Sequence, residues 1–376
     1  MTMSLPMCAI DFTDDKMGEE EQAIADRISE LKEILGDDLL ILGHHYQRDQ
    51  IVMHADLLGD SFMLAEMAAA SSAKNIVFCG VHFMAESADI LTNDDQKVIL
   101  PNLKAGCSMA DMAVLHEVES AWTDILSQTG LKDPIDKTDG ESYLIPVTYM
   151  NSSAELKDFV GRHGGVVCTS SNAIGILEWA YERAGPNGAV LFFPDQHLGR
   201  NTALKMGITH SQMAVWTPGQ PNDMPVNLRI VLWHGFCSVH KRFTIKQIDE
   251  FRAKHPEGLV VVHPECPFEI VEAADANGST EFIRKFVAQQ LPGTHIAVGT
   301  EINMVARLDK EHKNLSVECL DDSVCPCSTM YMIHPVFLMD VLERIVDGEI
   351  PNQITVSKEV AYGSKLALDR MLAIKN

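Results

Sequence analysis

Short apolar runs alternate with amphipathic segments along most of the chain. Residues 19–35 place apolar side chains at every third or fourth position, which predicts an opening helix with one buried face. Short, often β-branched runs follow at intervals and predict buried strands, among them DLLILG, NIVFCG, YLIPVT and LVVV. Strands that alternate with helices in this way indicate an α/β fold built on parallel sheets.

The order of these elements repeats near the two ends of the chain. In each copy a strand enters a histidine, a helix begins near a hydroxyl residue, a second strand ends at a glycine, and a third leads to a cysteine. The landmarks are His44, Ser61, Gly80 and Cys107 in the first copy and His263, Ser279, Gly299 and Cys325 in the second. Their successive intervals are 17, 19 and 27 residues against 16, 20 and 26. This agreement indicates an internal repeat.

A third, looser copy lies between these two. YLIPVT enters Tyr149, but the cysteine of this copy, Cys237, comes later than the pattern predicts. The sequence therefore predicts three homologous three-layer αβα units with pseudo-threefold symmetry around a central active site. We place the units at residues 1–118 (with an N-terminal extension), 143–241 and 242–345, and expect a C-terminal helix over 357–376 to pack on the first unit. Two segments rich in turn-forming residues are expected to be surface insertions, at 118–142 and 205–227.

Composition narrows the classes of function. The net charge of −23 would repel nucleic-acid phosphates, so no nucleic-acid partner is expected. No apolar run approaches the roughly 20 residues that a membrane span needs, and the acidic N-terminus does not resemble a signal peptide. We therefore expect a cytoplasmic protein with no membrane contact. The nine cysteines should be reduced thiols or metal ligands rather than disulfides.

Several groups suited to proton transfer follow the predicted strands. Because ligands gather at the carboxyl ends of strands in open α/β sheets, we expect His44, Tyr149 and His263 to meet at one pocket. Histidine titrates near neutral pH and a closed site can tune a glutamate, so His44, His263, Glu265 and His240 are candidates for proton transfer and substrate orientation. A lone histidine is more often structural, and that alternative stays open for each of them.

Three cysteines lie in polar loops that contain glycine or proline. These are Cys107, Cys237 and Cys325, and the last is followed by proline, a common flank of iron–sulfur ligands. Any one of them alone could be an ordinary buried thiol. One cysteine from each unit favours a shared cluster. Cys327 is only two residues from Cys325, so binding of both to the same cluster is geometrically disfavoured.

Other polar side chains are placed to bind a ligand. Ser61 and Thr280 stand at predicted helix starts, where free backbone N–H groups favour anions, although simple N-capping is the commoner role of such hydroxyls. Tyr149 and Asn151 are two apart on an extended segment and can point to the same side. Met84 is the methionine that is best placed to touch a ligand.

With these motifs in order, the chain resembles the quinolinate synthase family. The resemblance rests on a series that spans about 300 residues in the family's order: GHHYQ (43–47), GDS (59–61), FCGVHFMAE (78–86), GCSMAD (106–111), TYMNSSAE (148–155), CTSSNA (168–173), PDQHLGR (194–200), WHGFCSVH (233–240), HPECP (263–267), GST (278–280) and CP (325–326).

The resemblance implies both a cofactor and a reaction. It implies a [4Fe–4S] cluster on Cys107, Cys237 and Cys325, whose open iron acts as a Lewis acid. The substrates would be iminoaspartate and dihydroxyacetone phosphate, and the products quinolinate, phosphate and water, in de novo NAD biosynthesis. A functional link to L-aspartate oxidase is also suggested.

The resemblance further implies roles for individual residues. Those that would contact iminoaspartate are His44, Ser61, Tyr149, Asn151, Ser170, His263, Glu265 and Thr280. Further pocket residues would be Tyr46, Met84 and His240. The catalytic residues would be Tyr149, Glu265 and His263.

Two other functions remain open at this point. One is a different iron–sulfur hydro-lyase, against which the predicted helix-start hydroxyls and Tyr149–Asn151 pair indicate a larger, two-substrate pocket. The other is a non-catalytic redox or iron sensor, which would need an output module that the sequence does not indicate. Cys327, beside the third predicted ligand, also permits a regulatory disulfide.

Overall fold

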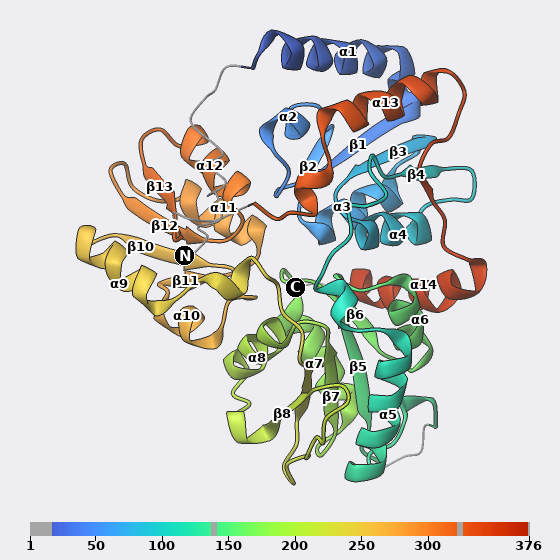
Figure 1. Cartoon of the computed structure of the whole chain (residues 1–376). Coiled ribbons are helices and arrows are strands. Elements are labelled where there is room, and N and C mark those ends of the chain that lie inside the picture. The colour runs from blue at the N-terminus through green and yellow to red at the C-terminus, as the bar shows by residue number, and fades with distance from the viewer. Residues whose placement is uncertain (1–16, 137–140, 322–325, 375–376) are drawn as a thin grey trace, which may run out of the picture.

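Three separate sheets organise the protein in a computed structural model that describes residues 17–136, 141–321 and 326–374 (Figure 1). All strand pairs within the three sheets are parallel except one at the edge of the first sheet. The predicted α/β class with parallel sheets is therefore confirmed. None of the described helices combines the length and the apolarity that crossing a lipid bilayer requires.

The first sheet has the strand order β14-β4-β3-β1-β2. Its strands are β1 (Leu39–His44), β2 (Leu57–Gly59), β3 (Asn75–Cys79), β4 (Lys97–Ile99) and the antiparallel β14 (Gln353–Ile354). The helices of this part are α1 (Glu19–Leu35), α2 (Asp49–Val52), α3 (Ser61–Ala70), α4 (His82–Leu91) and α13 (Pro335–Val346). The predicted opening helix coincides with α1, which buries Ala25, Ile28 and Leu31.

The second sheet has the order β6-β5-β7-β9-β8. Its strands are β5 (Leu144–Tyr149), β6 (Val166–Cys168), β7 (Ala189–Phe193), β8 (Met213–Trp216) and β9 (Ile230–Trp233). Its helices are α5 (Leu115–Thr129), α6 (Ala154–Arg162), α7 (Ala173–Ala184) and α8 (Gln196–Lys205). The predicted insertion at 118–142 contains most of α5, whose apolar face is buried, and the insertion at 205–227 contributes the edge strand β8.

The third sheet has the order β11-β10-β12-β13. Its strands are β10 (Leu259–Val262), β11 (Ala276–Asn277), β12 (His295–Gly299) and β13 (Ser316–Cys319), with helices α9 (Ile245–Lys254), α10 (Phe268–Ala273), α11 (Thr280–Ala288) and α12 (Ile302–Glu311). Val260 and Val262 pack into one apolar cluster and Val261 into another. Because successive side chains of a strand point to opposite faces, this sheet is covered on both sides, which explains its continuous apolar run.

The same four-strand order recurs in all three sheets: β2-β1-β3-β4, β6-β5-β7-β9 and β11-β10-β12-β13. In the second sheet β9 occupies the fourth place, and the segment of β8 is inserted before it in the chain. This insertion explains why Cys237, which follows β9, comes later in the sequence than the repeat predicts.

The chain after residue 326 departs from the predicted division. Helix α13, all but the last residue of which falls within the predicted third unit, packs against α1, and β14 then joins the first sheet. Helix α14 (Lys358–Ala373), expected on the first unit, lies mainly against α6 of the second (Figure 1). The two helices approach closely at Gly161 and Gly363, where a Cβ on Gly161 would lie 1.8 Å from the Gly363 carbonyl oxygen.

Candidate active site

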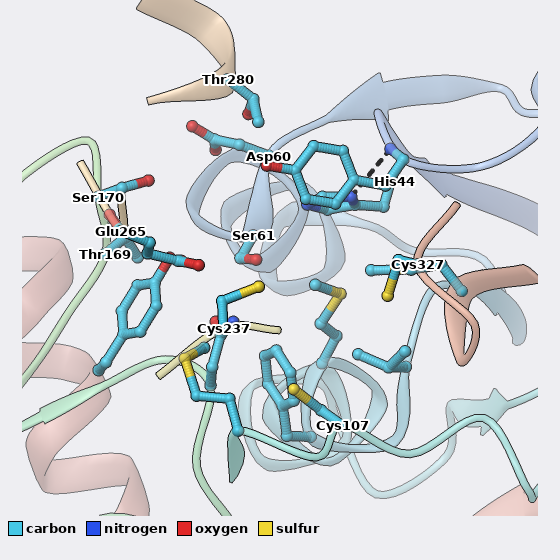
Figure 2. Close-up of a pocket in the computed structure, with 18 of the residues that line it drawn as sticks. His44, Asp60, Ser61, Cys107, Thr169, Ser170, Cys237, Glu265, Thr280 and Cys327 are labelled. Carbon is cyan, nitrogen blue, oxygen red and sulfur yellow. Dashed lines mark hydrogen bonds between the residues drawn. The ribbon is translucent and has the colours of Figure 1, made fainter. Parts of the chain in front are cut away.

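The carboxyl ends of strands from all three sheets line one pocket, with a cavity volume of about 70 Å³ (Figure 2). The predicted residues that line it are His44, Tyr46, Ser61, Met84, Cys107, Tyr149, Asn151, Ser170, Cys237, His263, Glu265 and Thr280. Cys327, which the sequence analysis disfavoured as a cluster ligand, also lines it, as do residues that the sequence did not single out: Asp60, Val81, Phe83, Met109, Thr169, Thr329 and Met330.

Two histidines of the repeat adopt the same local geometry. The Nδ1 atom of His44 accepts the backbone N–H of Tyr46 at 3.1 Å, and Nδ1 of His263 accepts that of Glu265 at 3.3 Å. Burial lowers the pKa of each imidazole to about 3, so both are neutral at pH 7. With Nδ1 used as an acceptor, the proton of each neutral ring is on Nε2. Each ring can therefore offer an N–H donor to an anionic ligand.

The hydroxyls at the two predicted helix starts are not N-caps. Asp60 caps α3 by accepting the Met63 N–H at 2.9 Å, and Ser279 caps α11. Ser61 and Thr280 are the first residues inside these helices, and both line the pocket. The capping alternative is therefore wrong for Ser61 and Thr280.

Two buried polar atoms of the pocket have no partner in the described part of the protein. These are Oγ1 of Thr280 and Oδ1 of Asn151. A buried polar atom without a hydrogen bond costs about 1–3 kcal/mol. Such atoms are typical of positions that a bound ligand or an ordered water completes.

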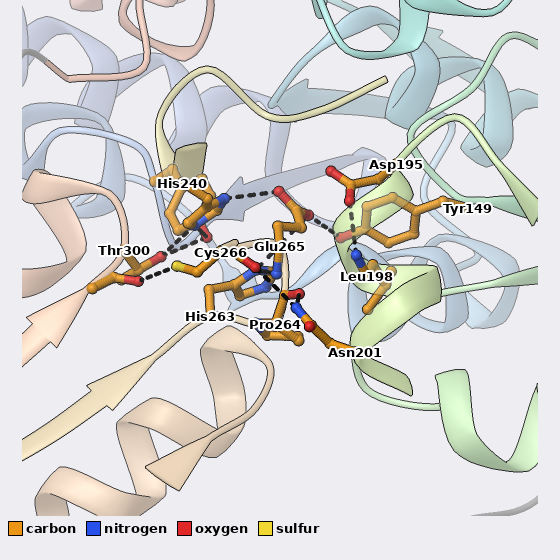
Figure 3. A network of polar contacts seen from close by, with 12 residues as sticks. Tyr149, Asp195, Leu198, Asn201, His240, His263, Pro264, Glu265, Cys266 and Thr300 are labelled. Atoms are coloured by element: carbon orange, nitrogen blue, oxygen red, sulfur yellow. Dashed lines mark hydrogen bonds and ion pairs between the residues drawn. The ribbon is translucent and has the colours of Figure 1, made fainter. Parts of the chain in front are cut away.

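A chain of hydrogen bonds crosses the pocket (Figure 3). The Tyr149 hydroxyl donates to Oε1 of Glu265 at 2.6 Å, and Oε2 of Glu265 pairs with Nδ1 of His240 at 2.8 Å. On the other side of the ring, Nε2 of His240 lies 3.0 Å from the Thr300 hydroxyl. That hydroxyl lies 2.8 Å from the hydroxyl of Tyr46. His240 does not line the pocket itself but contacts Glu265 from behind.

The electrostatics of this chain favour an ionised glutamate. Burial alone would raise the pKa of Glu265, but the nearby His263 and His240, together with hydrogen bonds from His240 and Tyr149, lower it to about 2. Burial and the charge of Glu265 raise the pKa of Tyr149 well above its ordinary value. Tyr149 therefore holds its proton at 2.6 Å from an anionic acceptor, a geometry suited to proton transfer.

Asp195 adds a second carboxyl beside this chain. It is fully buried, and its Oδ1 caps α8 by accepting the Leu198 N–H at 2.8 Å. Burial, and then the charge of Glu265, raise the pKa of Asp195 well above its ordinary value. The pKa values of the two carboxyls are thus driven apart, that of Glu265 being lowered and that of Asp195 raised.

Three cysteines from the three parts of the fold line the pocket. Cys107 comes from the chain after β4, Cys237 from the loop after β9, and Cys327 from the chain after β13 (Figure 2). Cys325, the predicted third ligand, lies outside the described residues. The interval from Gly299 is 26 residues to Cys325 and 28 to Cys327, against 27 in the first copy, so spacing alone could not choose between them.

The chemistry of these cysteines suits a metal group. Burial raises the pKa of Cys107 to about 12 and also raises those of Cys237 and Cys327. Thiolates at these positions need a positive partner, which a bound metal supplies. Ligand atoms of Cys237, His240 and Glu265 lie within 4.8 Å of one another, so the cysteine side of the pocket adjoins the hydrogen-bond chain.

Comparison with known proteins identifies close relatives. The sequence model described as "Quinolinate synthetase A protein" matches residues 26–373. A protein of Corynebacterium glutamicum named quinolinate synthase is 54% identical over 93% of this chain and 86% of its own length. Those of Rhodopirellula baltica and Bacillus velezensis, which bear the same name, are 48% and 43% identical. The first covers 95% of this chain and 92% of its own length, and the second 99% and 98%.

Proposed function

The chain belongs to the quinolinate synthase family, and we propose that the pocket described above is its active site. The protein condenses iminoaspartate with dihydroxyacetone phosphate to give quinolinate, phosphate and water. The observation that carries this proposal is the meeting of three cysteines with the Tyr149–Glu265 pair in one pocket. Membership of this family decides against the two alternative functions, a hydro-lyase that acts on a single hydroxy acid and a non-catalytic sensor.

The cofactor of this pocket is proposed to be a [4Fe–4S] cluster. Cys107 and Cys237 would hold it, together with one thiolate of the Cys325-Pro326-Cys327 segment. Cys327 lines the pocket, and we propose it for that third place; the family resemblance suggested Cys325, which lies outside the described residues. When bound by three thiolates, such a cluster supplies an open iron that can act as a Lewis acid.

The other residues of the pocket would bind the substrates and move protons. His44 and His263 would donate their Nε2–H groups to substrate carboxylates, and Ser61 and Thr280 would do so from two helix starts. Asn151 and Ser170 would complete the contacts, with Met84 and Tyr46 as walls.

Tyr149 and Glu265 would transfer protons during dehydration and ring closure. The Tyr149 hydroxyl donates to the carboxylate of Glu265, whose other oxygen contacts Nδ1 of His240. The burial of His44, His263 and Glu265 would help to keep water from the imine of the substrate.

We further propose that the three sheets are homologous units with pseudo-threefold symmetry around this pocket. The shared four-strand order and the matching histidine geometry of His44 and His263 support this proposal. The division at residues 1–118, 143–241 and 242–345 is kept for the strands of the three sheets other than β14, and α13 is moved from the third unit to the first. Superposition of the three four-strand cores onto one another would test it, and mismatched strand directions would refute it.

Location and pathway are proposed from the family. The protein is expected in the cytoplasm, with a functional link to L-aspartate oxidase as the source of iminoaspartate. Cell fractionation tests the location. Quinolinate formation from aspartate by the two purified enzymes together tests the link, which fails if the oxidase product does not serve as substrate.

The cluster proposal is tested by anaerobic purification, with iron and sulfide measured alongside quinolinate formation. We expect Cys107→Ser, Cys237→Ser and Cys327→Ser to lose the cluster and the activity, while Cys325→Ser keeps most of both. Cys168→Ser is the matched control, because Cys168 is buried in β6 and does not itself line the pocket. Loss in Cys325→Ser with retention in Cys327→Ser would restore the original ligand prediction. Full cluster content in Cys107→Ser and Cys237→Ser would overturn the whole site.

A further inference from the structure

A second cavity lies outside the active-site pocket and is larger than it. Its volume is about 540 Å³, which is in the range of small-molecule sites. It lies between the second and third parts of the fold, where α10 packs against both α8 and α9 (Figure 1). None of the described residues that line it also lines the active-site pocket. The cavity is therefore a separate site and not an extension of the substrate pocket.

A buried histidine without a partner lines this cavity. His197 is 9% exposed, and within the described chain neither Nδ1 nor Nε2 of its ring has a hydrogen-bond partner. Burial, and then the positive charges of Arg200 and Lys241, lower the pKa of His197 to about 4, so the ring is neutral at pH 7. A neutral imidazole has one donor and one acceptor, and both are costly to leave unused when buried. Such a ring points to a ligand that completes it.

Two cations that line the same cavity have no acidic partner. Arg200 follows the histidine by one turn of α8, and its guanidinium donates to Oε1 of the neutral Gln196 at 3.1 Å. The ammonium group of Lys241 lies 3.5 Å from the centre of the Phe236 ring. No ion pair of either cation occurs among the described residues, and Glu269 is the one acidic residue among those that line the cavity. In a chain with a net charge of −23, such a lining favours an anion.

Aromatic and apolar side chains form the rest of the cavity wall. Phe243 is buried, and the rings of Phe268 and His210 meet edge to face with their centres 5.0 Å apart. The flat ring of a ligand packs well against aromatic side chains of this kind. The wall therefore suits a molecule that carries a ring beside its anionic group.

Short segments of the chain connect this cavity to the active site. Lys241 directly follows His240, and Pro267, which also lines the cavity, comes two residues after Glu265. In the active site, Oε2 of Glu265 pairs with Nδ1 of His240. Helix α8, which supplies two residues of the cavity wall, is capped by the buried Asp195. A ligand that draws the cavity wall together would therefore act on the segments that position the hydrogen-bond chain of the active site.

We propose that this cavity is a regulatory site for a small aromatic anion. Arg200 and Lys241 would pair with its phosphate or carboxylate group, and Phe243 and Phe268 would pack on its ring. His197 would complete its unused hydrogen bonds on the ligand. Nucleoside monophosphates and aromatic carboxylates are two sources of this chemistry.

Anaerobic isothermal titration calorimetry of the full-length, cluster-loaded protein tests the site. AMP and benzoate represent the two sources, and adenosine and benzamide are their uncharged counterparts. The better of the two anions should bind one site per chain with Kd below about 1 mM. Its uncharged counterpart should bind at least about tenfold more weakly, as expected for the loss of a charge-assisted hydrogen bond.

Substitutions of the two cations locate the binding. Arg200→Met and Lys241→Met should each weaken binding of the anion roughly tenfold or more, while Lys241→Arg should retain most of the affinity. The control is Lys254→Met, at an exposed lysine in α9 that does not line the cavity, and it should bind as the wild type does. Circular dichroism and cluster content, measured on every variant, separate a loss of folding from a loss of binding.

The regulatory role has its own measurement, which is kcat for quinolinate formation with and without the bound anion. Saturation with the anion should change kcat several-fold. Failure of both anions to bind, equal binding of the uncharged counterpart, or unchanged binding in Arg200→Met and Lys241→Met would refute the site. Binding without any change in kcat would refute the regulation. If the wild type forms no quinolinate, the proposed function fails, and the titrations still decide whether the anion site exists.

Discussion

Replacing Tyr149 by phenylalanine removes one hydroxyl from the centre of the pocket and little else. Tyr149 is 5% exposed, and its hydroxyl donates at 2.6 Å to the buried carboxylate of Glu265. A hydrogen bond to a charged group contributes about 1.5–3 kcal/mol, so Tyr149→Phe should lower the free energy of unfolding by about 2 kcal/mol. Loss of a positioned proton donor should lower kcat/KM by about 10²- to 10⁴-fold.

Tyr181 provides the matched control for this substitution. Its hydroxyl is buried like that of Tyr149 but has no hydrogen-bond partner within the described residues, and burial raises its pKa. Tyr181→Phe removes an unsatisfied group, so it should leave the free energy of unfolding unchanged or higher and the activity intact. Anaerobic denaturant titrations and initial rates of both variants give the comparison. A Tyr149→Phe enzyme within tenfold of wild-type kcat/KM would refute the role of this hydroxyl in proton transfer.

Three further substitutions probe other parts of the molecule. Thr300→Val should lower kcat about tenfold with little change in KM, because His240 and Tyr46 lose the hydroxyl that both contact. Thr300→Ser keeps that hydroxyl and should restore the rate, so equal losses of kcat in the two variants would contradict this role. Burial lowers the pKa of Lys157 to about 8, and the unfolded chain binds more protons above that pH. The free energy of unfolding of wild type relative to Lys157→Met should therefore rise by about 3 kcal/mol between pH 8 and 10.5, and a flat difference in denaturant titrations would contradict the burial argument. Gly161→Ala should destabilise the protein by about 1–3 kcal/mol or more, because the added methyl group clashes with α14. Helix propensity alone predicts the opposite, a stabilisation of about 1 kcal/mol. Thermal unfolding of the variant decides between the two signs.

The strands and the strand-end residues could be predicted because local pattern decides them. A fully buried parallel strand must be apolar on both faces, and runs such as LVVV show that requirement directly in the sequence. The repeat then predicted that His44 and His263 occupy equivalent positions, and their matching Nδ1 bonds agree with it. The sequence predicted an insertion at 205–227, but only the sheet order shows that this segment supplies the edge strand β8 before the strand that leads to Cys237.

The packing partner of α14 could not be predicted from the helix itself. Its apolar face would fit the first or the second part of the fold. Helix α14 packs on α6 because Gly363 of α14 faces Gly161 of α6, so the two backbones can approach more closely than any side chain would allow. Bonds from Ser364 to the Ala154 carbonyl and from Arg370 to the carbonyl of Gly161 then fix the register. Such pairings join positions far apart in the chain and leave no local pattern.

Other residues of the site were not predicted from the sequence because their roles depend on residues that are neighbours only in the folded protein. Thr300 and Glu301 directly follow β12, and the two side chains contact different parts of the pocket. Thr300 bonds to His240 and Tyr46, while the fully buried Glu301 caps α12 and accepts the backbone N–H of Cys327 at 3.2 Å. One strand end therefore holds both the hydrogen-bond chain of Glu265 and the segment that carries the third cysteine. The buried carboxyl group of Glu301 also accepts the backbone N–H groups of Asn303 and Met304, so it cannot follow a shift of Cys327 without losing those bonds. A shift of the Cys327 segment would therefore disturb the end of β12 and, with it, Thr300.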